Sequence, residues 1–119
     1  PVVLFSAAIP FQGGVRHINE QWPEYWVKLF EKKSFVPIDY LRWQIWNIQD
    51  IEVWYRQNVL LFVNKSYINK NKIFLELFER YGKVLSVVHP ELYLMKVEAK
   101  NMSWRFKSRL VGLLKNFVR

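Results

Sequence analysis

The chain of 119 residues contains no cysteine. Disulfide bonds, cysteine-ligated zinc and a cysteine nucleophile are therefore excluded, and this composition fits a reducing compartment, so we expect a cytoplasmic protein. Histidine is also scarce: only His17 and His89 occur, far apart and without neighbours at metal-ligand spacing, so we expect no metal site. Long apolar runs are missing too, since none approaches the roughly 20 residues of a membrane-spanning helix.

Glycine is the next scarce residue. The chain has four glycines, Gly13, Gly14, Gly82 and Gly112, and they form no GxGxxG loop of the kind that holds a nucleotide-type cofactor. Apolar and aromatic residues are plentiful instead, at 51% and 18% of the sequence, which favours a folded core over disorder. The length suits one small domain better than two.

Acidic residues are scarce in the second half of the chain. Residues 1–64 hold six basic and six acidic residues, whereas residues 65–119 hold twelve basic and four acidic ones. We take this shift as the boundary between a sheet-forming part, residues 1–64, and a basic, mostly helical extension, residues 65–119. A solvated helix face is the first interpretation of the basic tail, a peripheral contact with an anionic membrane the second, and nucleic-acid binding the third.

The first segment predicts a strand, a loop and a helix. The apolar run Val2–Ala8 is typical of a strand buried on both faces. Pro10 ends the strand, and Gly13 with Gly14 makes a loop that can approach a ligand closely. The helix should run from Pro23 to about Lys33, because proline suits a first helical position and apolar residues recur at helical spacing.

Two further strands complete an expected α/β sheet. Phe35–Leu41 should be an edge strand, because Pro37 cannot donate a ladder hydrogen bond. A polar-aromatic connection at 42–54 leads to a third strand, Tyr55–Asn64, with a continuous apolar stretch typical of a central position. We expect this third strand to lie antiparallel between two strands that are parallel to each other.

The second half predicts mostly helices. An apolar stripe predicts a helix that ends at Gly82, and Val84–Val88 is a short strand or an extended packing segment. Pro90 should begin a short helix, and Ser103 should cap a separate last helix. The apolar face of that last helix contains Phe106, Leu110, Leu113, Leu114 and Phe117.

Four polar side chains within five positions mark the loop as a candidate site: His17, Asn19, Glu20 and Gln21. Histidine can act as a general base on an acceptor hydroxyl or amine, and Glu20 could hold or deprotonate the same group. The competing interpretation is that Asn19 and Glu20 only cap the following helix. Spacing alone leaves both interpretations open.

The connection after the second strand holds further candidates. Trp43, Trp46, Trp54 and Tyr55 could line a pocket for a flat or apolar acceptor, or form a hydrophobic plug over the sheet end. Two arginines nearby, at positions 42 and 56, could bind an anionic acceptor group, although isolated arginines are more often surface charges.

Two long motifs resemble one enzyme family. The segment Val3–Trp26 reads VLFSAAIP-x-QGG-x-x-H-x-NEQWP-x-YW, and Ile45–Val63 reads IWNIQDIEVWYRQNVLLFV. Both segments, in this order, resemble the C-terminal half of a bacterial subgroup of class I S-adenosylmethionine-dependent methyltransferases. The resemblance implies that the three strands are the fifth, sixth and seventh of a seven-stranded Rossmann-like sheet. It covers about half of the chain.

The resemblance implies methyl transfer from S-adenosylmethionine to a small-molecule or glycan-type acceptor. In that family a glycine-rich loop and an acidic residue hold the cofactor, and this sequence has neither feature. We therefore expect the chain to supply only the acceptor side and to be inactive alone. Its cofactor-binding residues are unknown. A first strand deprived of a neighbour should make the fragment self-associate. The implied catalytic residues are His17 and Glu20, and the implied acceptor-binding residues are Gln12, Gly13, Gly14, Asn19, Gln21, Trp22, Trp54 and Tyr55. The alternative is a non-enzymatic α/β module whose basic tail binds an anionic surface.

Overall fold

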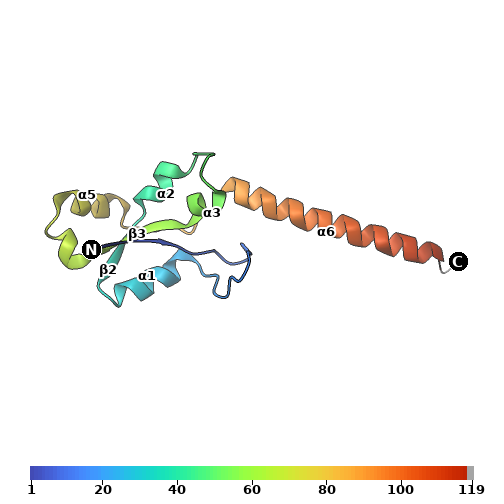
Figure 1. Ribbon diagram of the computed structural model, residues 1–119, viewed down its shortest axis with the longest axis horizontal. Helices are drawn as coiled ribbons and strands as arrows, with labels where there is room; N and C mark the ends of the chain where they lie inside the picture. The colour runs from blue at the N-terminus through green and yellow to red at the C-terminus, as the bar shows by residue number, and fades with distance from the viewer. Residues whose placement is uncertain (118–119) are drawn as a thin grey trace. The chain divides into compact units, whose positions relative to one another are not determined.

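The computed structural model describes residues 1–117, with side chains for residues 1–107, and it divides into two units (Figure 1). The first unit, Pro1–His89, is a mixed α/β fold, and the second begins at Pro90. In chain order the elements are β1 Val2–Ser6, α1 Pro23–Glu31, β2 Phe35–Ile38, α2 Tyr40–Ile45, α3 Val53–Asn58, β3 Val59–Asn64, α4 Lys65–Ile68, α5 Lys72–Tyr81 and α6 Pro90–Phe117.

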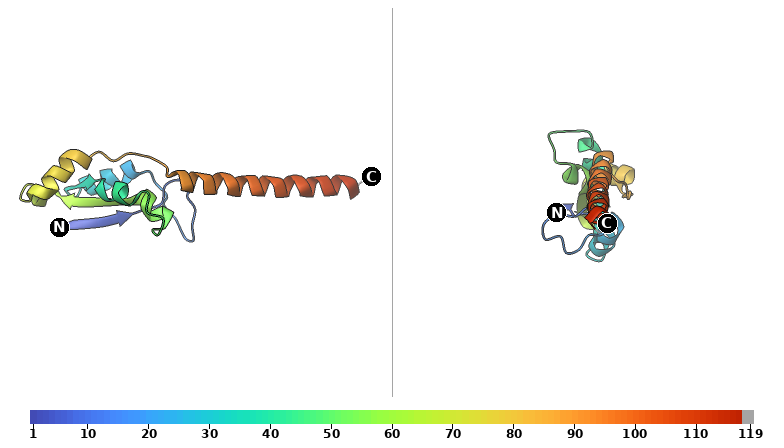
Figure 2. Two further views of the ribbon diagram at one scale, coloured as in Figure 1. Left: turned by 90° about the horizontal axis from the view of Figure 1, so that it is seen from above. Right: turned by 90° about the vertical axis from the view of Figure 1, so that its right-hand side faces the viewer.

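The three strands form one sheet in the order β1-β3-β2, and both pairings are antiparallel. The blue arrow of β1 and the green arrow of β3 point in opposite directions in Figure 2. Leu61 of β3 lies opposite Leu4 of β1 on one side and opposite Ile38 of β2 on the other. The central, antiparallel position expected for the third strand is therefore confirmed, and so is the edge position of the strand that contains Pro37. Central placement explains why β3 is almost wholly apolar: both of its faces are covered.

Helix α1 covers one face of the sheet through aromatic side chains. The ring of Phe30 stacks on Phe62 of β3 with centroids 3.8 Å apart, and Phe5 of β1 lies 5.1 Å from Trp26 and 5.3 Å from Phe30. An edge-on aromatic pair such as Phe5 with Phe30 adds about 0.5–1.5 kcal/mol beyond area burial. Of the apolar residues expected to form one buried stripe, Trp26 and Phe30 face the sheet, whereas Trp22, Tyr25 and Leu29 are exposed, so the stripe is only partly confirmed.

Helices α4 and α5 cover the opposite face over β2 and β3. Four buried residues form the core there (Val36, Ile38, Val63 and Ile68), and Phe74, Leu77, Phe78 and Tyr81 pack against it. Asn71 caps α5 by accepting from the backbone N–H groups of Ile73 and Phe74. Gly82 is the C-cap of α5, as expected. A Cβ at this position would lie 2.5 Å from the Phe78 carbonyl oxygen, so glycine is the residue that fits there.

The expectation that the first strand is buried on both faces is wrong. Leu4 is 64% exposed and Val2 is also exposed, whereas Val3 and Phe5 are half-buried. Alternate residues of a strand point to opposite faces of the sheet, so the exposed side chains of Val2 and Leu4 lie on the same face as α5. Helix α5 lies over β2 and leaves this part of β1 uncovered. In the described part of the chain β1 also has no strand partner other than β3.

The boundaries expected for the second and third strands are also wrong. The third strand was expected to begin at Tyr55, but Val53–Asn58 form α3. The second strand was expected to run to Leu41, but α2 begins at Tyr40. Three consecutive polar residues of α3, Arg56, Gln57 and Asn58, are buried. A helical turn places these side chains against specific partners, whereas an alternating strand would send them to two opposite faces.

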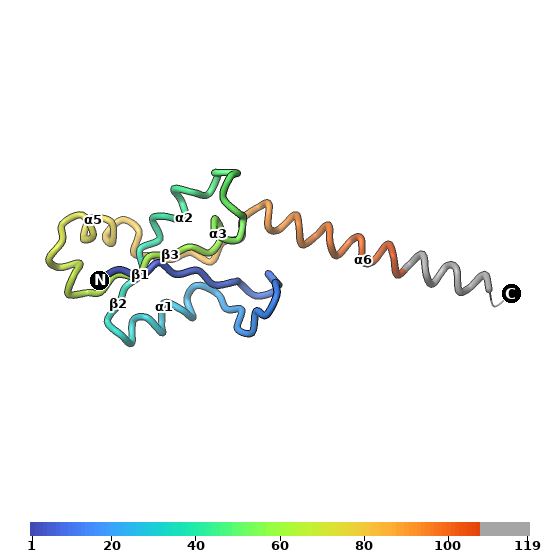
Figure 3. The backbone as a smooth tube through the Cα atoms, in the orientation of Figure 1, coloured from blue at the N-terminus to red at the C-terminus, as the bar shows by residue number. Residues whose placement is uncertain are grey.

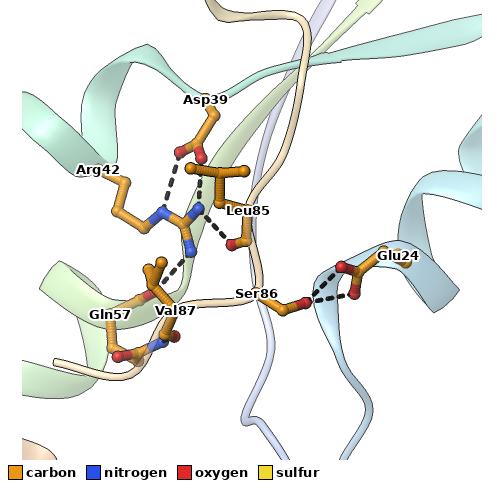
Figure 4. Close-up of polar contacts among 7 residues, drawn as sticks. All are labelled: Glu24, Asp39, Arg42, Gln57, Leu85, Ser86 and Val87. Atoms are coloured by element: carbon orange, nitrogen blue, oxygen red, sulfur yellow. Dashed lines mark hydrogen bonds and ion pairs between the residues drawn. The ribbon is translucent and has the colours of Figure 1, made fainter.

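The segment 83–89 is extended (Figure 3). Buried polar side chains, not strand pairing, bind it to the rest of the first unit. Arg42 donates to Asp39 from Nε and Nη2, to the Leu85 carbonyl at 2.7 Å and to the Gln57 carbonyl at 3.5 Å (Figure 4). Gln57 donates to the Val87 carbonyl at 2.6 Å. Burial raises the pKa of the Asp39 carboxyl above its ordinary value, although Arg42 opposes this shift.

The second unit contains one long helix, α6. The separate short helix expected from Pro90 and the cap expected at Ser103 are wrong, because Ser103 lies inside α6. Residues 90–107 contain no glycine or second proline that would interrupt the helix. The expected apolar side chains Leu110, Leu113, Leu114 and Phe117 lie outside the side chains that the structure describes.

Across the described residues, no helix combines the length and the apolar character that a membrane crossing requires.

Candidate functional site

A pocket of about 560 Å³ opens at the carboxyl end of β1. Its walls come from three places: the end of β1 with the loop that follows, α1, and α3. The loop side is mainly polar and the helix side mainly aromatic, which is the usual composition of a small-molecule site. The lining residues are Phe5, Ser6, Ala7, Ala8, Gln12, Arg16, His17, Ile18, Asn19, Trp26, Trp54, Tyr55 and Asn58.

Glu20 holds the loop in its shape. Its carboxylate accepts from the backbone N–H of Phe11 at 2.9 Å and from that of Gly13 at 2.6 Å. Phe11, Gly13 and Arg16 have positive φ angles of 65°, 69° and 63°, which are costly for residues with a Cβ. Charge-assisted hydrogen bonds to the backbone offset this cost. Glu20 itself does not line the pocket.

His17 is positioned by its two neighbours in the loop. Its Nδ1 lies 3.6 Å from a carboxylate oxygen of Glu20, and its side chain is 42% exposed in the pocket wall. The imidazole lies directly over Gly14: a Cβ at position 14 would lie 2.5 Å from His17 Cε1 and 2.8 Å from Nδ1. Gly14 therefore provides the space that His17 occupies.

Gly14→Ala should displace His17 and destabilise the protein. The residue has φ of 136°, and alanine at positive φ typically costs more than about 1 kcal/mol. Urea unfolding should show this loss, and the NMR signals of the His17 ring should shift. Gly13→Ala is the matched control, because φ there is also positive but no atom is found near the added Cβ. An unshifted His17 ring in Gly14→Ala would contradict this account.

Gln12 joins the loop to α3. Its Oε1 accepts from the Ile9 N–H at 3.3 Å and from Asn58 Nδ2 at 2.8 Å. Two atoms of the lining residues, Asn58 Oδ1 and Trp26 Nε1, are buried and have no hydrogen-bond partner within the described chain. A buried polar group without a partner costs about 1–3 kcal/mol. Both atoms are enclosed by the protein, so they are a cost within the pocket walls and not a contact offered to a bound molecule.

The structure brings together some of the predicted site residues. Five of them line the pocket: Gln12, His17, Asn19, Trp54 and Tyr55. Five others do not line it: Gly13, Gly14, Glu20, Gln21 and Trp22. Gln21 supports the loop, since its backbone N–H donates to the Ala8 carbonyl and its Nε2 donates to Asn19 Oδ1 at 3.0 Å. Trp22 is the N-cap residue of α1.

The interpretation that Asn19 and Glu20 cap the next helix is wrong. Helix α1 has no side-chain cap, and it begins after Trp22 with Pro23 at its first position. Proline has no N–H to be satisfied there, so one of the usual reasons for a polar cap is removed. The polar residues of the loop are therefore available to shape the pocket.

The aromatic residues of the connection divide into two groups. Trp54 and Tyr55 line the pocket, whereas the Trp43 and Trp46 rings lie 5.1 Å apart outside it, and Trp46 contacts the buried ring of His89. The expectation that Arg42 and Arg56 are surface charges is wrong, since both are buried. Neither arginine lines the pocket, and Arg42 is bound to Asp39, so its role is structural.

Several lining residues were not singled out from the sequence: Phe5, Ser6, Ala7, Ala8, Arg16, Ile18, Trp26 and Asn58. The end of β1 could have been found, because a small-residue run such as Ser6-Ala7-Ala8 before a glycine loop leaves space for a ligand. Asn58 carried no such signal, since its place depends on α3 being a helix.

Comparisons of the chain with protein-family models, curated proteins and solved structures found no match. Any function must therefore be argued from the pocket and the sequence motifs. The described residues do not fit S-adenosylmethionine. Cofactors of open α/β sheets bind where neighbouring parallel strands end together, and β1 here has only an antiparallel neighbour.

Proposed function

We propose that this chain supplies the acceptor side of an S-adenosylmethionine-dependent methyltransferase that acts on a small-molecule or glycan-type acceptor. The VLFSAAIP-x-QGG-x-x-H-x-NEQWP motif supports the family assignment, because its loop and histidine lie at the pocket. The β1-β3-β2 order agrees with the fifth, seventh and sixth strands of that Rossmann-like fold. The cofactor belongs to the complete enzyme, and its binding residues are not among residues 1–117.

The observation that carries the proposal is the placement of His17. The ring lies in the pocket wall, and its Nδ1 faces Glu20. A carboxylate at Nδ1 favours the tautomer with the proton there, which leaves Nε2 free to accept a proton. His17 Nε2 would therefore remove the proton of an acceptor hydroxyl or amine, while Glu20 orients the ring. This arrangement makes His17 the catalytic residue and Glu20 its positioning residue.

The pocket walls favour an acceptor with one apolar face and several hydroxyl groups. Trp54 and Tyr55 offer flat aromatic surface, and Asn19 and Arg16 offer polar groups beside it. A sugar ring has both properties, which supports the glycan-type acceptor over a purely apolar one.

The test compares the 119-residue chain with the protein translated from its complete reading frame. We expect the chain alone to show no measurable S-adenosylmethionine binding by calorimetry, and the complete protein to transfer labelled methyl groups to sugar acceptors. We also expect a glycine-rich strand-loop-helix encoded upstream of Pro1, with an acidic residue about 20 positions further on. Micromolar cofactor binding by the chain alone, or a stop codon directly upstream, would refute the proposal.

A further inference from the structure

The pocket contains a cation and no carboxylate in its walls. Arg16 and His17 line it, whereas no aspartate or glutamate is found among its described lining residues. The carboxylate of the loop, Glu20, is already engaged, because it accepts from the Phe11 and Gly13 N–H groups. A concave site with an unbalanced positive charge attracts a ligand that carries negative charge.

The guanidinium of Arg16 has no protein partner. Among the residues that the structure describes, no carboxylate forms an ion pair with it and no oxygen accepts a hydrogen bond from it. The buried arginines of the same unit differ, since Arg42 is bound to Asp39 and Arg56 donates to the Trp46 carbonyl. A guanidinium is a planar fork of five N–H donors that matches a carboxylate or a phosphate. Arg16 is therefore free to bind such a group in the pocket.

Asn19 adds a second donor to the same wall. Its Oδ1 accepts from Gln21 Nε2 at 3.0 Å, so this end of the amide is used inside the loop. Its Nδ2 donates to no group of the described chain, and Asn19 lines the pocket. An arginine and an amide donor on one wall suit the oxygen atoms of an anionic group.

The loop presents Arg16 in a conformation that an unconstrained chain avoids. Its φ of 63° lies in the left-handed region, which is costly for a residue with a Cβ. Backbone strain of this kind is frequent at ligand-binding sites, where the surrounding structure holds it in place. Arg16 and His17 are consecutive residues, so an anion bound to Arg16 would lie near the hydroxyl group that His17 deprotonates.

We propose that Arg16 determines the specificity of this pocket and that its ligand is an anionic sugar, whose carboxylate or phosphate group binds to Arg16 and Asn19. The aromatic surface of Trp54 and Tyr55 covers the apolar face of the sugar ring. The identification of this sugar as the methyl acceptor rests on the proposed function, whereas its binding is measurable without methyl transfer.

NMR titration of the full chain with three related sugars tests the charge of the ligand. Glucuronate carries a carboxylate, glucosyl phosphate carries a phosphate, and glucose carries neither group. We expect at least one of the two anionic sugars to bind roughly tenfold or more tightly than glucose, because hydrogen bonds to charged groups are the stronger ones. The indole signal of Trp54 should shift during the titration. The tighter of the two anionic sugars identifies the group that Arg16 binds.

Substitutions of Arg16 test the assigned residue. Arg16→Gln should lower the affinity for the anionic sugar to that for glucose and leave the affinity for glucose nearly unchanged. Arg16→Lys should retain part of the preference, since an ammonium group keeps the charge but lacks the planar fork. Arg80→Gln is the matched control, because it removes the same charge at an exposed position of α5 that does not line the pocket. It should bind as the parent does.

Equal affinities for glucose and both anionic sugars would overturn the proposal. Equal losses in Arg16→Gln and Arg80→Gln would also overturn it, since general attraction by a chain of net charge +8 would then explain the binding. Methyl transfer by the complete protein is the separate readout. Transfer to glucose but to neither anionic sugar would refute this proposal and leave the proposed function intact. Binding that depends on Arg16, without methyl transfer to any sugar, would support the anion site and refute the proposed function.

Discussion

Arg42→Met should lower the free energy of unfolding by about 3–5 kcal/mol at neutral pH, because it leaves a buried carboxylate without its partner. Arg42 is 0% exposed, and its guanidinium donates to Asp39 and to the carbonyl groups of Leu85 and Gln57. The substitution therefore removes a charge pair and also releases the segment 83–89 at Leu85. Urea unfolding followed by tryptophan fluorescence measures the change.

The matched control is Arg80→Met, which makes the same chemical change at an exposed position of α5 and should cost less than about 0.5 kcal/mol. The double variant Asp39→Leu/Arg42→Met should recover part of the loss, since apolar replacement of a whole buried pair is often tolerated. Equal stability of Arg42→Met and Arg80→Met would show that the buried pair does not hold the fold.

The loss in Arg42→Met should shrink as the pH falls. Burial already raises the pKa of Asp39, and removal of Arg42 takes away the main interaction that opposes this shift. A carboxyl group with a raised pKa in the folded state binds its proton more readily when folded than when unfolded. The folded variant therefore gains stability as the pH falls through that raised pKa, where the carboxyl becomes neutral. Unfolding curves at several acidic pH values would show this trend.

In the complete enzyme, His17→Ala should reduce turnover by about 10²–10⁴-fold and leave affinity for S-adenosylmethionine nearly unchanged. The reason is that His17 lies in the pocket wall, where an acceptor hydroxyl would bind, and takes up the proton. Glu20→Gln should also reduce turnover, because Gln cannot supply the negative charge that lies 3.6 Å from His17 Nδ1. Single-turnover rates, together with calorimetry of cofactor binding, separate these effects.

Val15→Ala is the control for the loop, because Val15 is exposed and does not line the pocket. It should turn over at the parent rate. Parent-like turnover of His17→Ala would mean that the pocket works by alignment alone and that His17 is not a base.

The sequence by itself determined features that depend on local pattern. The apolar run at β1, the helix that begins at Pro23 and the glycine end of α5 were predicted because each follows from neighbouring residues. The central place of β3 was predicted for the same reason: a continuous apolar stretch needs cover on both faces. The polar loop was recognised as a candidate site from its unusual density of functional side chains.

Only the tertiary structure decided what each polar residue contacts. Glu20 was expected to act on the acceptor, yet its carboxylate holds the loop; Arg42 was expected at a surface or an anion site, yet it lies buried against Asp39. The helix α3 was missed because its polar residues are satisfied by partners 30 or more positions away, such as the Val87 carbonyl for Gln57 and Gln12 for Asn58. Local patterns report which residues prefer burial, whereas hydrogen-bond partners that are distant in the sequence meet only after the chain has folded.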